Sequence, residues 1–287
     1  MLHAVPELDA MDRLLDAAEA LSGLELRTIA THGTAEDLAD TRVAQPLLYL
    51  VDWAWGSTLM ECGVTPVALA GHSLGEFAAL ALADVFSVEA GLELVVERSQ
   101  LMATTAASTP GGMVAVLGMN AATVASVVEG IRDVWLANDN APGQVVLSGT
   151  SAALDVATAF LTEAGARRIV PLAVAGPFHS PLMSPAGDAF ADVLRSTQMR
   201  DATLPVLQNT DPLPATDATL IRDRLIGQMV SPVRWTETMR TLVADGPLTL
   251  VEAGPGAILS GLAKRIEGLS AISVESEGIE STLLEVS

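Results

Sequence analysis

The chain has 287 residues, of which 50% are hydrophobic, so it is long enough for one large domain with a smaller one beside it. Its 35 acidic residues against 15 basic ones give a formal net charge of -20, which argues against nucleic acid as a partner because a polyanion would be repelled. No apolar run approaches the ~18 residues of a membrane span, the N-terminus lacks the layout of a secretory signal, and the single cysteine, Cys62, excludes an intramolecular disulfide.

We therefore expect a cytoplasmic protein that does not bind a membrane.

The first third of the chain predicts helices around one strand. Apolar residues at helical spacing predict a helix over Leu8–Leu21, and a largely apolar second helix over Thr41–Leu59 has Pro46 placed for its first turn. A run of small apolar residues, Pro66–Ala70, predicts a buried strand, and Val88–Ala106 predicts a further helix.

The pattern Gly71-His72-Ser73-Leu74-Gly75 lies between that strand and an apolar helix, which is the arrangement of a nucleophile elbow. Glycines two residues before and after the serine suit a sharp turn that leaves no room for a Cβ. The helix that begins behind the serine directs N–H groups and its positive dipole end at any negative charge that develops there. A structural glycine turn is the alternative, but the flanking strand and helix favour Ser73 as a nucleophile.

The next segment alternates strands and helices in the order strand, helix, strand, strand, helix, strand. That order is typical of a split βαβ, ferredoxin-like unit. We therefore predict an inserted ferredoxin-like subdomain at residues 111–175. Its strands are predicted at Met113–Met119, Val134–Ala137, Gln144–Ser148 and Arg168–Val174, and its helices at Ala121–Ile131 and Ser151–Ala164.

The last third returns to the larger domain, which we place at residues 1–110 and 176–287. We expect an α/β fold, with a hydrolase-like large domain built on a mainly parallel sheet. The acidic tail after Val274 reads as a frayed, solvated end. Helices are predicted up to Ser196 and over Leu220–Met229, Trp235–Ala244 and Ala257–Ile266; strands are predicted at Pro205–Asn209, Leu248–Glu252 and Ala271–Val274, the last of which closes the sheet.

A serine hydroxyl needs a base within hydrogen-bond reach, and His179 is the candidate because it follows Gly-Pro where the insert returns to the large domain. His72 adjoins Ser73, but neighbours at a tight turn point apart, so we expect His72 to line the pocket or support the elbow. No two of the four histidines share metal-ligand spacing, and we expect no metal.

Five segments, in order along nearly the whole chain, resemble the acyltransferase family of fatty acid and polyketide synthesis, and most closely its stand-alone malonyl-transferring type. Gln45-Pro46 and the segment from Glu252 to Gly256 also resemble family segments. The five are Gly71-His72-Ser73-Leu74-Gly75-Glu76-Phe77, Glu97-Arg98-Ser-Gln-Leu-Met102, Asn138-Asp-Asn140-Ala-Pro-Gly-Gln-Val-Val146, Gly176-Pro-Phe-His179-Ser180 and Gln228-Met-Val-Ser-Pro-Val-Arg-Trp235.

The resemblance implies roles at matching positions. Ser73 would hold the malonyl group as an ester, His179 would act as base and then acid, and Gln228 would orient His179 through its main-chain carbonyl. Arg98 would grip the free malonyl carboxylate, which suits a planar guanidinium. From the residues alone, Arg98 on the polar face of a helix reads as a solvated charge.

The remaining implied residues bind substrate. The Leu74 N–H would be one oxyanion donor, and Asn140, with Asn138, would lie in a loop near the cleft, although turn chemistry alone could explain both asparagines. Phe178 beside His179 resembles the malonyl-selective form of its motif.

The resemblance also implies the reaction and its partners. The malonyl group would pass from malonyl-CoA to the phosphopantetheine thiol of acyl carrier protein by a ping-pong route, with the CoA thioester as substrate and no bound cofactor. The family motifs do not separate a fatty acid role from a polyketide role. We expect a monomer.

Two alternatives stay open. Family members begin with a strand that ends in a Gly-Gln-Gly-x-Gln loop, and this chain starts beyond that point, so it could be a truncated acyltransferase that binds without turnover. A serine esterase or thioesterase would instead need an acid between serine and histidine in the chain. Asp133, Asp139 and Asp155 occupy that interval, all inside the insert.

Overall fold

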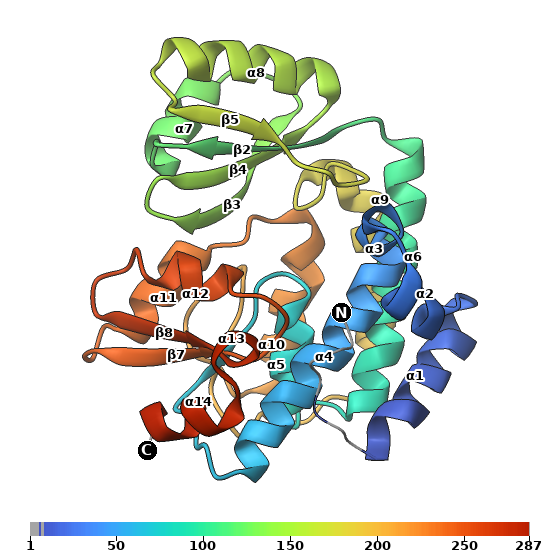
Figure 1. The fold of residues 1–287 in the computed structure, drawn as a ribbon. Helices are drawn as coiled ribbons and strands as arrows, with labels where there is room; N and C mark the ends of the chain where they lie inside the picture. Colours follow the sequence, from blue (N-terminus) through green and yellow to red (C-terminus); the bar gives the residue numbers. More distant parts are fainter. Residues whose placement is uncertain (1–5, 7–8, 287) are drawn as a thin grey trace.

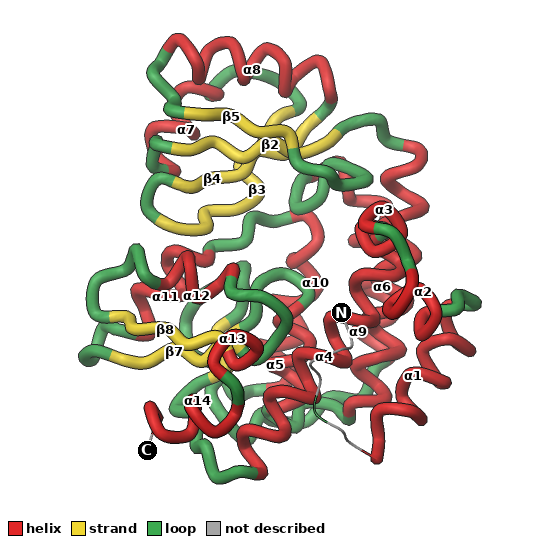
Figure 2. Tube along the Cα trace, viewed as in Figure 1, coloured by secondary structure: helices red, strands yellow, loops and turns green. Residues whose placement is uncertain are grey.

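The structure, a computed structural model, describes residue 6 and residues 9–286. Its chain forms two units, a large one and a smaller one that projects from it (Figure 1). Strands occur in both units, and helices make up most of the rest of the large unit (Figure 2). In the described residues, no helix is long and apolar enough to cross a membrane.

The chain begins with helices. The first predicted helix is confirmed as α1, although Leu8 lies outside the described residues. The polar segment after it contains two short helices that the sequence did not predict, and Pro46 is the sixth residue of its helix rather than part of the first turn, because that helix begins at Thr41. The bounds are α1 Asp9–Ser22, α2 Leu26–His32, α3 Ala35–Ala39 and α4 Thr41–Glu61.

The core of the large unit lies around three helices, α4, α5 (Gly75–Leu82) and α6 (Val88–Ser108). Burial explains why these elements form together. Leu47, Leu50, Phe77, Leu80 and Leu92 have no exposed surface, and burying such side chains contributes about 1.5–3 kcal/mol each. α5 thereby fixes the position of the elbow that precedes it.

The strands of the large unit pair in parallel, as predicted, but in two separate sheets. β1 (Leu69–Ala70) pairs with β6 (Val206–Leu207), and β7 (Leu248–Glu252) pairs with β8 (Leu269–Ser273). The predicted last strand therefore exists, but it pairs with β7 in a sheet apart from β1 and does not close a common one.

The small unit has the predicted order of elements. Its four strands pair antiparallel in the order β3-β4-β2-β5, and its two helices contact each other and the sheet, with which they share a separate core that includes Val116, Leu147 and Leu161. β3 continues through Asn138 and Asn140, which the sequence analysis placed beyond the strand. The bounds are β2 Gly112–Leu117, α7 Ala121–Val128, β3 Val134–Ala141, β4 Gln144–Gly149, α8 Ser151–Glu163 and β5 Arg168–Pro171.

The small unit is joined to the large one by the two chain connections beside β2 and β5 and by contacts along β3. The chain enters through β2 and leaves through the neighbouring edge strand β5, and within the small unit Leu172 N donates to Met113 O at 2.9 Å. At the other edge, Val233 of the large unit bonds to β3: its O accepts from Asp139 N at 2.9 Å and its N donates to Ala137 O at 2.8 Å.

The remaining elements are mostly helical. The tail after Val274 forms two helices, so the expectation of a frayed end is wrong, and Thr282 is fully buried there. The bounds are 3-10 helix η2 Pro181–Met183, α9 Ser184–Ser196, α10 Ala218–Gly227, 3-10 helix η3 Gln228–Val230, α11 Trp235–Leu242, α12 Ile258–Ala263, α13 Val274–Glu277 and α14 Ile279–Val286.

Candidate active site

The elbow has a strained backbone. Ser73 lies between β1 and α5 with a φ of 51°, in the left-handed region that non-glycine residues rarely adopt. A Cβ on Gly71 would lie 1.9 Å from Gly75 C, so this position requires glycine. A Cβ on Gly75 would meet nothing closer than Asp52 Oδ2 at 3.8 Å. The expectation that both glycines are required for space therefore holds at Gly71 and is wrong at Gly75.

Ser73 and His179 lie in hydrogen-bond contact. The distance from Ser73 Oγ to His179 Nε2 is 2.8 Å, and His179 Nδ1 lies 3.1 Å from the main-chain O of Gln228. A carbonyl oxygen can only accept, so Nδ1 carries the proton and Nε2 is left to accept from the serine hydroxyl. Burial, and next the charge of Arg98, lower the pKa of His179 to about 3, so the imidazole is neutral at pH 7 and can act as a base.

Arg98 is buried, with 1% of its surface exposed, so its interpretation as a solvated charge is wrong. Its guanidinium donates to Gln45 Oε1 at 2.5 Å and, through one nitrogen, to Gln228 Oε1 at 3.0 Å and Ser73 Oγ at 3.2 Å. No carboxylate within the described residues forms an ion pair with it. Burial lowers the pKa of Arg98 to about 10, which the negative charge of Glu76 opposes, and the group stays charged at pH 7.

Gln228 contacts three parts of the site. Its main-chain O faces His179, its Oε1 accepts from Arg98, and its Nε2 donates to Ser73 O at 3.0 Å. It lies in η3, where a tight 3-10 turn presents both the carbonyl and the side chain to the elbow. One residue therefore fixes the base, the cation and the backbone of the serine relative to one another.

His72 points to the small unit. Its Nε2 lies 2.8 Å from Asn140 Oδ1 and 3.4 Å from Asn138 Nδ2, and its ring packs against Trp235 with centroids 5.5 Å apart in an edge-on arrangement. Both asparagines come from β3 rather than from a turn. Burial lowers the pKa of His72. The residue beside Ser73 thus joins the elbow to the small unit.

Two backbone N–H groups at the elbow differ in whether they are hydrogen-bonded. The Ser73 N–H donates to Asn209 Oδ1 at 2.7 Å. Within the described part of the chain, no hydrogen bond is made by the N–H of Leu74, the residue after the serine. That is the N–H that completes an oxyanion hole in a nucleophile elbow.

The acid that an esterase requires is not found at this histidine. Within the described residues, His179 Nδ1 faces a main-chain carbonyl and none of the three candidate acids bonds to it. Asp139 accepts instead from Thr236 Oγ1 at 2.7 Å. No group of three His, Cys, Asp or Glu side chains in the described residues is arranged to hold a metal ion.

Sequence reasoning missed three supporting residues, Gln45, Glu76 and Asn209. In the sequence, Asn209 is the end of a predicted strand, and the carboxyl ends of parallel strands commonly carry site residues. Gln45 and Glu76 lie in segments that resemble the family, without an implied role. The rule on strand ends could have identified Asn209 in advance; nothing in the local pattern identifies the other two.

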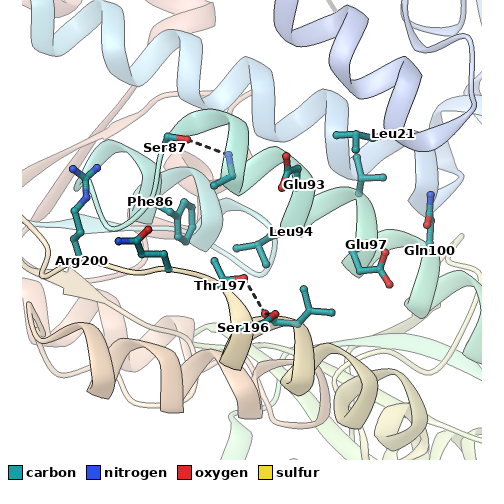
Figure 3. Close-up of a pocket in the computed structure, with 14 residues that line it drawn as sticks. Leu21, Phe86, Ser87, Glu93, Leu94, Glu97, Gln100, Ser196, Thr197 and Arg200 are labelled. Atoms are coloured by element: carbon teal, nitrogen blue, oxygen red, sulfur yellow. Dashed lines mark hydrogen bonds between the residues drawn. The ribbon is translucent and has the colours of Figure 1, made fainter.

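A groove of about 760 Å³ lies elsewhere, beside helices α1, α6 and α9 (Figure 3). Its wall includes Glu93, Glu97 and Gln100 on α6, with Arg200 near one end. Successive residues of a helix project about 100° apart, so Glu97 lines the groove while Arg98 points to Ser73. None of the predicted site residues lines it.

The sequence matches the family described as "Acyl transferase domain" over residues 7–277. Two similar proteins are named malonyl CoA-acyl carrier protein transacylase. The one from Bacillus subtilis (strain 168) is 38% identical over 264 residues, which are 91% of this chain and 83% of the relative. The one from Haemophilus influenzae is 40% identical over 266 residues, 90% of this chain and 84% of the relative.

Solved structures resemble most of the chain. One is the Synechocystis sp. PCC 6803 malonyl-CoA:ACP transacylase, with a TM-score of 0.86, 37% identity, and coverage of 93% of this chain and 89% of that one. Another holds a type II PKS acyl-carrier protein in complex with its malonyl-transacylase. It has a TM-score of 0.91, 34% identity, and coverage of 98% of this chain and 92% of that one.

Proposed function

The chain belongs to the acyl transferase family, and on that basis we propose that it transfers a malonyl group from malonyl-CoA to the phosphopantetheine thiol of acyl carrier protein. The observation that carries the proposal is the buried Arg98 guanidinium, 3.2 Å from Ser73 Oγ. A hydrolase of simple esters does not need a desolvated cation beside its nucleophile. An enzyme that binds an acyl group ending in a carboxylate does, because the cation can pair with that carboxylate.

The first half-reaction forms an ester on Ser73. Its hydroxyl proton passes to His179 Nε2 while Oγ attacks the thioester carbonyl, and the Leu74 N–H stabilises the oxyanion. The C–S bond then breaks, and the proton on Nε2 passes to the leaving CoA thiolate. The main-chain carbonyl of Gln228 holds the imidazole through Nδ1–H in both protonation states.

The second half-reaction runs the same steps with a different thiol. The phosphopantetheine thiol gives its proton to His179 Nε2 and attacks the Ser73 ester, and Oγ leaves with that proton. Overall one thioester is exchanged for another through an oxygen ester, so the bond energy is nearly conserved, and we propose that the protein's own groups suffice without a metal or bound cofactor. The matched complex of a malonyl-transacylase with an acyl-carrier protein supports this choice of acceptor.

Arg98 selects the malonyl group. One of its nitrogens donates to Ser73 Oγ, so a carboxylate two bonds beyond the ester carbonyl lies within reach of the guanidinium. Two charge-assisted hydrogen bonds to that carboxylate would neutralise a buried cation that otherwise has only amide and hydroxyl acceptors. An acetyl group offers no such partner.

We also propose the organisation around this site. Residues 111–175 form an inserted ferredoxin-like subdomain, a view supported by the antiparallel order β3-β4-β2-β5. Residues 1–110 and 176–287 form a hydrolase-like large domain, supported by the elbow between β1 and α5. The protein acts as a monomer in the cytoplasm.

Intact-mass spectrometry after brief incubation with malonyl-CoA tests the function. We expect a malonyl adduct on the wild type, none on Ser73→Ala, and a much weaker one on Arg98→Ala, with acetyl-CoA labelling the wild type poorly. Arg132→Ala removes an exposed arginine of the small unit and should label normally. No adduct on the wild type from any acyl-CoA would refute turnover and favour a protein that only binds.

A further inference from the structure

We propose that Asn209 is a positioning residue that holds the strained Ser73 elbow in its reactive shape, and that Glu76 in turn holds Asn209. The inference rests on the function proposed above and adds to it two residues that do not touch the reacting atoms. Both are buried, with 1% of their surface exposed.

The side-chain amide of Asn209 bridges the strained turn. Its Oδ1 accepts from Ser73 N at 2.7 Å, and its Nδ2 donates to Gly71 O at 2.7 Å. The orientation of the amide is fixed by its partners, because a backbone N–H can only donate and a carbonyl can only accept. One planar group therefore fixes the separation of the peptide groups on either side of the turn, where the φ of Ser73 is 51°.

Glu76 holds Asn209 from the other side. Its carboxylate accepts from Asn209 N at 2.9 Å and from Gln208 Nε2 at 3.0 Å. Glu76 lies in the first turn of α5, three residues after Ser73, while Asn209 follows β6. Starting from Ser73, the contacts run through Asn209 to Glu76 and back along α5 to Ser73. This closed loop ties the helix and the strand end to the same turn.

The arrangement has a chemical consequence for the oxyanion hole. Asn209 occupies the Ser73 N–H, so that group cannot donate to an oxyanion. The Leu74 N–H then remains as the elbow's donor, and its direction depends on the peptide plane that Asn209 holds. A shift of the turn would misdirect both this donor and Ser73 Oγ relative to His179.

Kinetics of Ser73 acylation by malonyl-CoA, measured by rapid quench and intact mass, tests the inference. We expect Asn209→Ala to lower kcat about 100-fold, the loss typical of a small misplacement of reacting groups, with KM nearly unchanged because Arg98 still binds the carboxylate. The matched control is Asn120→Ala, which removes an asparagine that caps α7 in the small unit, and it should keep the wild-type rate.

A second variant separates positioning from folding. In Asn209→Asp the ionised carboxyl can accept from Ser73 N but repels Gly71 O, whereas its protonated form accepts from the one and donates to the other. Glu76 is the negative group beside it, and His72, Arg98 and His179 are the other ionisable groups at the elbow. We expect acylation by Asn209→Asp to be slow at pH 8 and to recover toward the wild-type rate at about pH 5.5.

The outcomes are distinguishable. An unlabelled wild type would refute the proposed function itself. A labelled wild type together with Asn209→Ala at the wild-type rate, or with a raised KM and unchanged kcat, would overturn the role of Asn209. So would an Asn209→Asp rate that follows only the folded fraction measured by circular dichroism at each pH, with no recovery in acid.

Discussion

Ser73 Oγ lies 2.8 Å from His179 Nε2, although the two residues are separated by 106 positions and by the whole of the small unit. His179 follows the segment in which the chain returns from that unit, and it too has a left-handed backbone, with a φ of 54°. Both members of the reactive pair thus sit on strained turns. Each is held by neighbours, Ser73 by Asn209 and His179 by Gln228.

The two elbow glycines should respond differently to alanine. Gly71→Ala places a Cβ 1.9 Å from Gly75 C, against backbone that cannot move without opening the turn, so we expect loss of acylation and a lower Tm. Gly75→Ala meets only Asp52 Oδ2 at 3.8 Å, and at this first residue of α5 alanine suits the helix better than glycine by less than the ~1 kcal/mol of a helix interior. We expect an active enzyme of equal or higher Tm. Equal losses in the two variants would contradict the steric explanation.

The pH dependence of acylation should reflect the buried histidine. His179 acts as a base only when neutral, and its pKa is lowered from 6.5 to about 3, so protonation does not begin to inhibit until well below pH 5. We expect kcat/KM, which reports the free enzyme, to stay flat from pH 7 to pH 5. The rate of acylation at low malonyl-CoA concentration measures kcat/KM at each pH. A loss of rate in acid centred near pH 6.5 would contradict this prediction.

The lowered pKa of His179 also affects the stability of the fold. Between its lowered folded pKa and its ordinary unfolded value, His179 binds a proton only in the unfolded chain, so its contribution to stability falls as pH drops from about 6.5 to about 3. Burial raises the pKa of Glu76, which acts in the opposite direction, since its folded form takes up a proton first. Urea unfolding should therefore show the wild type losing stability relative to His179→Phe between pH 8 and pH 5.

Truncating Gln228 should separate the contribution of its side chain to activity from that of its main-chain carbonyl. Gln228→Ala removes one of the acceptors of Arg98 and the donor to Ser73 O but keeps the carbonyl that faces His179. Hydrogen bonds to charged groups contribute about 1.5–3 kcal/mol, so we expect a loss of about 10- to 150-fold in malonyl transfer. The pH profile should keep its shape. Gln198→Ala, on an exposed loop, is the control, and a changed acid limb would contradict the backbone role.

Gln45 should prove important for malonyl binding. Gln45→Leu leaves one nitrogen of the buried Arg98 without the acceptor it now has at 2.5 Å, which costs about 1–3 kcal/mol. We expect a raised KM for malonyl-CoA and a smaller preference for malonyl over acetyl. Gln100→Leu alters the groove face of α6 and should change neither. An unchanged KM in Gln45→Leu would mean that Gln45 does not hold Arg98 in place.

The sequence allowed the elbow to be found because its signal is local: a strand, five residues and a helix. The order of elements in the small unit was predictable for the same reason. The burial of Arg98 was not, because its acceptors Gln45 and Gln228 lie 53 and 130 positions away, and a helix pattern shows which face is polar but not what covers it. Predicting the contact between Asn209 and the elbow would have required knowing which strand end lies beside Ser73.

The remaining differences also have physical causes. The acidic tail reads as solvated by composition, yet Val274 and Thr282 are fully buried against the large unit, and this packing outweighs the charge of the tail. Pro46 is favoured in a first turn, but Asp40 accepts from Arg42 N and starts the helix earlier. In both cases tertiary contacts or a cap outweigh a local preference.

The way the small unit is attached limits how the protein can move. A body joined along one edge can rotate about that edge, but this one is also bonded to Val233 at the opposite edge, through two main-chain hydrogen bonds of 2.8 and 2.9 Å. The second attachment opposes that rotation, because turning the small unit would break both bonds. While these bonds hold, the spacing between Ser73 in the large unit and Asn140 in the small one stays fixed, and an acyl donor would meet walls that are already in place.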